Sequence, residues 1–522
     1  MRTRMLSLSM LAASLLAGCQ DLEIANTNAP DRRRALSQPG DVETLSTSTF
    51  RNLWTAMHNE DDSYNTLTVV SDVFTATYAN NAALELSSEP RPPFNNNTLS
   101  DAHNVSRIPW EHFYRGISSA NDVLFAINDG LVINTPVTVG GAIADNTARA
   151  KAFSMWSRAI SHLYLAALFD KNFIVREDAN LEDPLQNPLV EYPASMDSAL
   201  KLVDEAATFL NANPFMLPDL WINGLTPTNA DLARIVNSYA ARMIVYAART
   251  PQQRRALNWD QVVAYADKGI TADFAPLLQS GQITSGFLSR LQQTGTFSAW
   301  GDYKFVGMAD VSGGYKAWLD KPVPQRERFL ITTPDRRLTG PTPTSDGAYY
   351  RYRADNIFRP ERGTYHHSHY QWRRNAGRTN TQPYTILSVD EMNLLRAEAA
   401  YHKNDLDRAA QLINLTRTRQ VRIGTTTYPG LPAVTRDGVP ASATCVPRAD
   451  GVTCGTLLQA LMYERIMENQ ALDTFVAYLD SRGFGRLLAG TFLHMPIPAR
   501  ELETLGLPIY SFGGVGGPGA AQ

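Results

Sequence analysis

The sequence has few cysteines, no excess of positive charge and none of the short motifs that commonly mark an enzyme. Three cysteines among 522 residues are too few for a scaffold built on disulfides. The formal net charge is −3, so no basic surface for nucleic acid is indicated. No GxSxG, HExxH or P-loop motif occurs, and no GxGxxG lies in a strand–helix context. These absences argue against nucleic-acid binding and favour no standard enzyme class.

The N-terminus carries the most specific local signal. Residues 5–15 form an apolar run that is too short to cross a bilayer as a helix. Leu16-Ala17-Gly18-Cys19 follows it with the pattern of a bacterial lipobox. We therefore expect a signal peptide that is cleaved before Cys19, with acyl chains attached to that cysteine. More than one acyl chain would anchor the protein stably in a membrane.

Lipidation would use one cysteine and leave Cys445 and Cys454 in a polar loop rich in proline and glycine. In an oxidising compartment the two residues favour a disulfide over two free thiols. Closing so small a loop would stabilise the fold by about 2–3 kcal/mol. Two cysteines alone make a poor zinc site, so no metal is predicted there.

The clearest helical signal lies in residues 387–424. Ser388 with Glu391 marks one helix start, and Asp405 marks a second. Small alanines on both apolar stripes would let the two backbones approach closely, as in a TPR-like helix pair. Further helical stripes without a strict 34-residue period cover residues 108–127, 151–169, 192–210, 229–249, 259–271 and 457–477. This pattern is typical of an irregular helical repeat.

Helical periodicity disappears between about residues 274 and 385, where glycine, proline, serine, threonine and aromatic residues dominate. So long a stretch inside a compact protein usually carries function. Trp300 and Trp318 are flanked by glycines and lie near Tyr303 and Tyr315. Their rings are either exposed platforms for a ligand or buried anchors of the loops.

A series of different short motifs follows one another along nearly the whole mature chain. They are residues 26–31, Trp110, Tyr114, Asn121, Ala397-Glu398-Ala399, Asp405, Ala409-Ala410, Ile413-Asn414, Arg417, Glu464-Arg465, Glu468, and Pro496-Ile497-Pro498 with Glu501-Leu502. Together they resemble the SusD/RagB-like outer-membrane nutrient-binding lipoproteins. Residues 471–485 depart from the usual family pattern. The resemblance implies a mostly α fold, an irregular TPR-like helical-repeat scaffold with a loop-rich, ligand-facing insertion.

The same resemblance implies a non-catalytic lipoprotein of the outer membrane that faces the cell exterior and needs no cofactor. It would bind an oligosaccharide or another large nutrient and deliver it to a TonB-dependent SusC-like β-barrel transporter. Two alternatives stay open. One is a scaffolding lipoprotein for outer-membrane protein assembly. The other is a surface glycoside hydrolase, for which Asp61, Asp62 and Glu111 are candidate carboxylates.

A carbohydrate site needs aromatic rings beside planar polar groups. In this family the ligand cleft is formed by loops from an early segment and from the mid-chain insertion. The candidate ligand-binding residues are therefore Asn80, Arg91, Phe94 and Asn95 in the early segment, and Trp300, Tyr303, Tyr315 and Trp318 in the insertion. No residue-level motif assigns a role to any of them.

The segment Tyr365-His366-His367-Ser368-His369-Tyr370 is the main concentration of histidine. On a strand, His367 and His369 would point the same way and could bind a metal. Nearby arginines would repel a cation, so a polar aromatic strand or loop near the ligand surface is favoured, and no metal site is predicted.

The predicted organisation has six parts. They are a lipoprotein signal peptide (1–18), the lipidated cysteine and a polar tether (19–40), an N-terminal helical part (41–275), a loop-rich insertion (276–385), a C-terminal part with the TPR-like helix pair and the closing segment (386–512), and a flexible glycine-rich tail (513–522).

Overall fold

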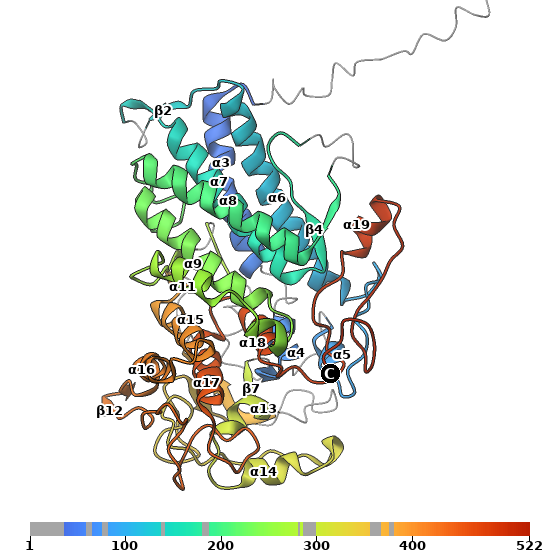
Figure 1. Cartoon of the computed structure of the whole chain (residues 1–522), viewed down its shortest axis with the longest axis vertical. Helices are drawn as coiled ribbons and strands as arrows, with labels where there is room; N and C mark the ends of the chain where they lie inside the picture. The colour runs from blue at the N-terminus through green and yellow to red at the C-terminus, as the bar shows by residue number, and fades with distance from the viewer. Residues whose placement is uncertain are drawn as a thin grey trace, which may run out of the picture.

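The computed structural model describes residues 36–58, 65–75, 82–136, 141–179, 187–279, 282–285, 299–354, 367–374 and 381–522. Cys19, the predicted signal peptide and most of the tether lie outside these residues. Helices dominate the described chain (Figure 1). No helix within the described ranges is both long and apolar enough to cross a membrane.

The larger helices form one continuous stack (Figure 1). Its members are α3 (Pro39–His58), α6 (His103–Asn128), α7 (Thr147–Leu168), α8 (Tyr192–Ala212), α9 (Asn229–Ala247), α11 (Trp259–Asp267), α15 (Val389–His402), α16 (Leu406–Arg417) and α17 (Leu457–Asn469). Shorter helices are α4 (Asn65–Val70), α5 (Ala83–Ser87), α10 (Pro251–Arg255), α13 (Tyr303–Val306), α14 (Gly314–Leu319), α18 (Val476–Gly483) and α19 (Ala499–Thr504). The predicted mostly α, TPR-like architecture is confirmed.

The apolar stripes of the sequence become the core of this stack. Trp110, Trp156 and Trp259, which helical spacing places on buried faces, are no more than 5% exposed. Phe153 stacks on Trp156 with ring centroids 5.4 Å apart, and Trp221 meets Phe153 edge-on at 5.1 Å. Tight ring packing of this kind joins α7 to the loop before α9.

The predicted helix pair is α15 and α16. The Ser388 hydroxyl accepts a hydrogen bond from the Glu391 backbone N–H at 3.0 Å, and the Asp405 carboxylate accepts one from the Arg408 N–H at 3.2 Å. Ala397 and Ala409 are completely buried, as expected where two helices approach closely. The start of each helix and its contact face therefore agree with the prediction.

Buried ion pairs fasten α15 to the rest of the stack. Arg242 of α9 lies 2.5 Å from Glu391, and Arg465 of α17 lies 2.7 Å from Glu398. Arg254 also pairs with Glu398. Burial alone would raise the pKa of Glu398, but Arg254 and Arg465 outweigh it and hold that pKa far below its ordinary value. Glu398 is therefore a fixed negative charge in the core.

The insertion contains more regular structure than the sequence predicts. A four-stranded antiparallel sheet has the order β1 (Phe74–Thr75), β7 (Trp300–Asp302), β9 (His367–Trp372), β8 (Tyr350–Tyr352). The early segment and the insertion thus meet in one sheet. The two-stranded ladders are β2 (Asn134–Pro136) with β3 (Ile143–Asp145), β4 (Lys171–Phe173) with β5 (Leu189–Glu191), β6 (Leu277–Leu278) with β10 (Gln382–Pro383), and β11 (Val421–Ile423) with β12 (Thr426–Tyr428).

The glycine-rich tail is not a free end, so the prediction of a flexible tail is wrong. Gly490 N–H donates to Ala521 at 2.8 Å, and Leu493 N–H donates to Gly519 at 2.8 Å. Gly514 has φ +80°, and a Cβ there would lie 2.9 Å from Pro93. Glycine lets the tail fold back closely on earlier segments, which composition alone does not reveal.

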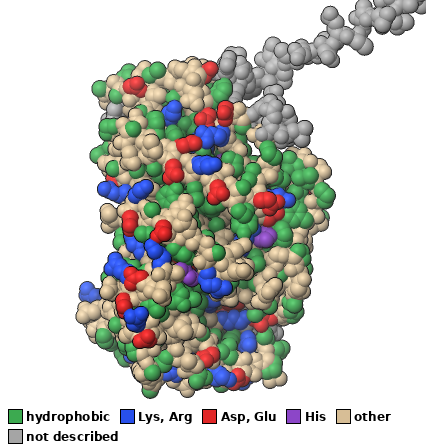
Figure 2. Space-filling view, viewed as in Figure 1, with side chains coloured by type: hydrophobic (Ala, Val, Ile, Leu, Met, Phe, Trp, Pro, Cys, Tyr) green, Lys and Arg blue, Asp and Glu red, His purple; other side chains and the backbone are tan. Residues whose placement is uncertain are grey.

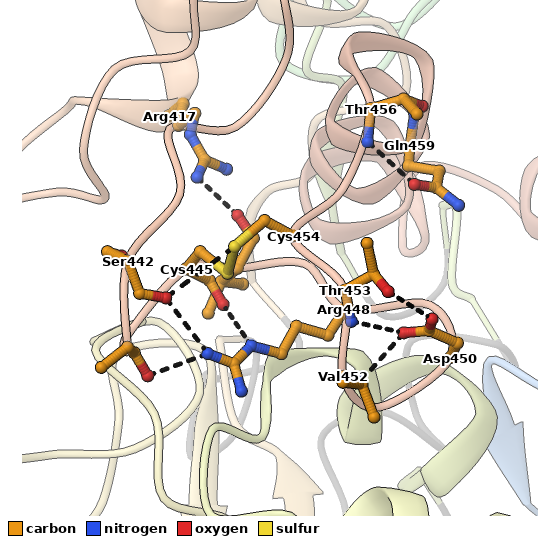
Figure 3. Close-up of a disulfide and its surroundings, with 12 residues drawn as sticks. Arg417, Ser442, Cys445, Arg448, Asp450, Val452, Thr453, Cys454, Thr456 and Gln459 are labelled. Carbon is orange, nitrogen blue, oxygen red and sulfur yellow. Dashed lines mark hydrogen bonds between the residues drawn. A yellow bond between two sulfur atoms is a disulfide. The ribbon is translucent and has the colours of Figure 1, made fainter.

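The predicted disulfide joins Cys445 to Cys454, with Cα atoms 5.6 Å apart (Figure 3). Arg448 donates to the carbonyls of Cys445 at 3.2 Å and Ala443 at 2.8 Å, inside the same loop. Arg417 of α16 donates to Val446 at 2.5 Å. The loop is therefore closed covalently and is also bound to the helix pair.

Candidate ligand-binding face

The four aromatic candidates of the insertion are buried. Trp300 and Tyr303 have no exposed surface, and Trp318 and Tyr315 are 2% and 3% exposed. The interpretation of these rings as exposed platforms is therefore wrong, and that of buried loop anchors is correct. Tyr303, Tyr315 and Trp318 form a packed aromatic layer beneath the surface, and the Trp300 ring lies 5.9 Å from the His367 ring.

Specific partners hold this layer together. Tyr303 stacks on Phe329 at 4.3 Å, and its hydroxyl donates to the Phe329 carbonyl at 2.6 Å. A Cβ on Gly307 would lie 2.3 Å from the Tyr315 ring. Glycine in this region makes room for rings to pack inward, whereas the sequence suggested that it presents them to solvent. The partner rings are distant in sequence, so local composition carries no signal for this arrangement.

The candidate ligand-binding residues of the early segment are not all buried. Arg91 is 2% exposed and donates to Asp72 at 2.7 Å and to Thr491 at 3.2 Å. Phe94 is buried against Phe492 at 5.1 Å. Asn95 is exposed, and Asn80 lies outside the described residues. Arg91 and Phe94 are thus structural supports, and Asn95 stays a prediction.

Half-buried aromatic and cationic side chains lie on strands β8 and β9. The Tyr352 and His369 rings are 5.7 Å apart, and His369 Nδ1 lies 3.1 Å from the Arg353 carbonyl oxygen. Burial is the main cause that lowers the pKa of His369 below its ordinary value, and the positive charge of Arg328 lowers it further. The ring is therefore neutral at neutral pH. This surface agrees with the favoured interpretation of the histidine segment as a polar aromatic strand.

The paired histidines do not form a common site. His367 is buried and lies 3.4 Å from the Thr75 hydroxyl, whereas His369 is half-buried beside Arg353. His366 lies outside the described residues. Within the part of the chain that the structure describes, no cluster of three metal-ligating side chains occurs.

A polar pocket of about 120 Å³ lies beyond the end of β9, and we call it the Arg374 pocket. It is lined by Asp273, Arg374, Tyr384, Thr385, Ser388, Asp390, Glu468, Ala471 and Leu472. These residues come from the segment between α11 and α15, from the start of α15, and from the end of α17 and the residues after it. Segments that are far apart in sequence therefore converge on one small hollow.

Arg374 is the most prominent side chain of the pocket. Its guanidinium lies over the Tyr349 ring at 4.4 Å and 3.4 Å from a Glu468 oxygen, yet the side chain is 41% exposed. Tyr349 donates its hydroxyl to Glu468 at 2.9 Å. The ring orients the guanidinium, and the exposed edge stays available to a ligand.

Two further carboxylates of the pocket are also fixed. Asp390 pairs with both terminal nitrogens of Arg419 at 2.6 and 2.7 Å, and Asp273 accepts from the Val389 N–H at 2.9 Å. Carboxylates can accept more hydrogen bonds than these contacts use. The pocket therefore offers acceptors beside a planar donor, which matches the hydroxyls of a sugar.

Another hollow is lined in part by Arg91, one of the candidate ligand-binding residues, and we call it the tail groove. It has about 680 Å³ and is lined mainly by Pro90, Arg91, Pro93, Phe512 and the glycines of the tail. The surface is apolar and offers few convergent hydrogen-bonding groups, so it fits a sugar less well.

Of the carboxylates considered for hydrolysis, only Glu111 lies among the described residues. Glu111 lies on α6 between Arg107 at 2.9 Å and Arg115 at 3.8 Å, and Asp61 and Asp62 lie outside the described residues. The arrangement gives no support to a hydrolytic site at Glu111.

Comparison of the sequence with family models and with curated proteins gives no match. Among solved structures, a SusD superfamily protein from Parabacteroides distasonis ATCC 8503 has a TM-score of 0.53 and 11% identity, over 89% of this chain and 97% of that one. A SusD-like protein from Bacteroides fragilis NCTC 9343 has a TM-score of 0.52 and 13% identity, over 86% of each chain. The protein therefore has the SusD-like helical fold, which the sequence motifs predict.

Proposed function

We propose that this protein is a non-catalytic binding protein that captures an oligosaccharide at the Arg374 pocket and the adjoining surface of β8 and β9. The observation that supports this most is the convergence of Arg374, Asp390 and Glu468 on one polar hollow, with the half-buried Tyr349 ring against Arg374. A binding site needs fixed donors and acceptors, and the described contacts provide them. The SusD-like fold supports this class of function.

We further propose that the ligand passes to a TonB-dependent SusC-like transporter in the outer membrane. The lipobox at Cys19 supports attachment to a membrane. A binding protein tethered at the mouth of a transporter raises the local ligand concentration, which is useful even when affinity is weak. Acidic and basic side chains are interspersed on the face in Figure 2, and this suits an uncharged ligand better than nucleic acid.

One end of the fold suits a position next to the membrane. The chain enters the described structure at Leu36, just before α3. Exposed apolar side chains occur just before β2, on β3 and in the loop before α9, namely Val132, Ile143, Met216 and Leu220. Arg149 ties these parts together, since it pairs with Glu43 of α3 at 2.5 Å and lies over the Trp221 ring at 5.1 Å. We propose that this end faces the outer membrane.

Calorimetric titration of the mature protein against a panel of oligosaccharides and peptides tests the proposed ligand class. We expect at least one oligosaccharide to bind, and Arg374→Ala to weaken that binding at least about tenfold through loss of charge-assisted hydrogen bonds. Arg176→Ala is the matched control, because Arg176 is equally exposed and pairs with Glu205 at the helical side. Release of reducing sugar, or turnover of any tested compound without stable binding, would contradict the proposal.

Affinity purification after mild solubilisation of membranes tests the partner. We expect one large TonB-dependent receptor to co-purify with the full-length lipoprotein, and a Cys19→Ala variant to be released from membranes. Co-purification of an insertion-machinery barrel in its place would favour the scaffolding alternative.

A further inference from the structure

Among the buried arginines of the described chain, two differ from the others because no described carboxylate pairs with them. Arg249 follows α9, and Arg482 lies on α18; their exposed fractions are 3% and 1%. By contrast, the buried Arg465 lies 2.7 Å from Glu398 and 3.0 Å from Asp480. Within the described chain, neither Arg249 nor Arg482 forms an ion pair.

Backbone carbonyls satisfy only part of the two guanidinium groups. Arg249 Nη2 donates to the Phe169 carbonyl at 2.5 Å, next to the end of α7. Arg482 donates from Nη1 to Leu493 at 2.6 Å and from Nη2 to Tyr246 at 2.6 Å and Ala167 at 3.0 Å. The last carbonyls of α7 and α9 carry partial negative charge, which stabilises both cations incompletely.

Several polar atoms of this cluster have no hydrogen-bond partner among the described residues. They are Nε and Nη1 of Arg249, Nε of Arg482 and Nδ1 of the adjacent His494. Burying an ionised group without a counter-charge is costly, and each unsatisfied donor adds to that cost. A bound anion would satisfy the charge and the donors together.

The three side chains meet near the end of α7, because Arg249 and Arg482 donate to the carbonyls of Phe169 and Ala167, and Arg482 also donates to Leu493, the neighbour of His494. Burial, followed by Arg482, lowers the pKa of Arg249 to about 9. Burial, followed by Arg249 and Arg482, lowers the pKa of His494 to about 2. His494 is therefore neutral, and two positive charges remain at neutral pH. The carboxylate of Asp170 contributes only weakly, and both its oxygens accept from the Tyr510 hydroxyl at 2.9 Å.

We propose that a small inorganic anion of the charge and size of chloride binds between Arg249 and Arg482 beside His494. The site is distinct from the Arg374 pocket and does not depend on the proposed sugar binding. The tail packs against it, since a Cβ on Gly519 would lie 3.0 Å from His494 Nε2. The bound anion would therefore fasten the ends of α7, α9 and α18 to the tail.

Thermal unfolding of the mature protein in sodium chloride, compared with sodium gluconate at equal ionic strength, tests the site. We expect Tm to rise with chloride by about 1 °C for each tenfold increase above the dissociation constant, because a ligand that binds only the folded chain stabilises it by mass action. Gluconate is too large for the site and should give no such rise. Equal Tm values in the two salts at every concentration would overturn the proposal.

Arg249→Gln tests the residues. The variant keeps a donor for the Phe169 carbonyl but removes one buried charge, so its Tm should no longer depend on chloride. Arg176→Gln, which removes an exposed arginine paired with Glu205 at 2.9 Å, should keep the wild-type dependence. An Arg249→Gln variant with the full wild-type dependence would contradict the assignment.

Bromide offers a readout on the wild-type protein that does not require a variant to fold. In crystals soaked in sodium bromide, an anomalous peak should lie within hydrogen-bonding distance of Arg249 and Arg482. An ordered water there without anomalous signal would show that solvent alone satisfies these groups, and the proposal would then be wrong.

Discussion

The helical stack and the insertion both bury large side chains, but they do so by different means. In the stack, long helices place apolar residues on one face, and charges such as Glu398 and Arg465 meet inside as ion pairs at 2.7 Å. In the insertion, short strands and helices bury aromatic rings against partners such as Phe329. Burial in the stack follows a local period, whereas burial in the insertion depends on long-range pairing.

The same contrast explains what the family-like motifs contribute. Glu398, Arg417, Glu464 and Arg465 all belong to such motifs, and all are buried in ion pairs. Arg337 joins them through Glu464 at 2.6 Å. These motif charges therefore hold the stack together. The surface that we propose binds the ligand carries no matching motif.

Breaking an ion pair of the stack should have the largest effect. Glu398→Gln leaves Arg254 and Arg465 without their shared carboxylate, and we expect a loss of about 3–5 kcal/mol in the free energy of unfolding. Urea denaturation measures it. Glu205→Gln removes an exposed carboxylate whose pair with Arg176 is solvent-screened, and it should change stability by less than about 1 kcal/mol. Equal effects of the two variants would contradict the structural role of Glu398.

The low pKa of Glu398 leads us to expect that stability falls in acid. The pKa of Glu398 is lower in the folded protein than its ordinary value of 4.5. Its contribution is therefore complete above about pH 4.5 and is lost as the pH falls further. Denaturation of the wild type and of Glu398→Gln between pH 3 and 7 should show a shallower acid decline in the variant. Parallel curves would contradict this assignment.

Opening the disulfide should have an intermediate effect. Replacing Cys445 and Cys454 with serine releases a loop with a sequence separation of 9, and we expect a loss of about 2–3 kcal/mol in the free energy of unfolding. Chemical denaturation with and without reductant measures it. Reductant should destabilise the wild type and leave the stability of the double variant unchanged. If complete reduction did not change the free energy of unfolding of the wild type, the prediction would be wrong.

Overfilling the aromatic layer of the insertion should have a smaller effect. Gly307→Ala places a Cβ against the Tyr315 ring, and we expect a loss of about 1–3 kcal/mol in the free energy of unfolding. Gly40→Ala is the control, because a Cβ there meets no atom within 4 Å. If both variants matched the wild type in denaturation, the rings would not be packed as described.

The sequence predicts the fold well where elements are long. The stripes of α6, α7 and α9, the caps at Ser388 and Asp405, and the Cys445–Cys454 disulfide all agree with the structure. It does not predict that Trp300 is buried on the central strand β7. The strands that pair with β7 come from residues 74–75 and 367–372, which are distant in sequence. It also does not single out Arg374, which we propose as a binding residue, since Tyr349 and Glu468, which orient it, are distant in sequence.

The location of a bound sugar tests the account most directly. A crystal of the mature protein soaked with an oligosaccharide that binds in calorimetry should show the sugar against Arg374, with its chain extending toward Tyr352 and His369. The rings of Trp300 and Trp318 should remain buried and make no contact with it. Density for the sugar in the tail groove, or stacked on a newly exposed Trp300 or Trp318, would contradict the account.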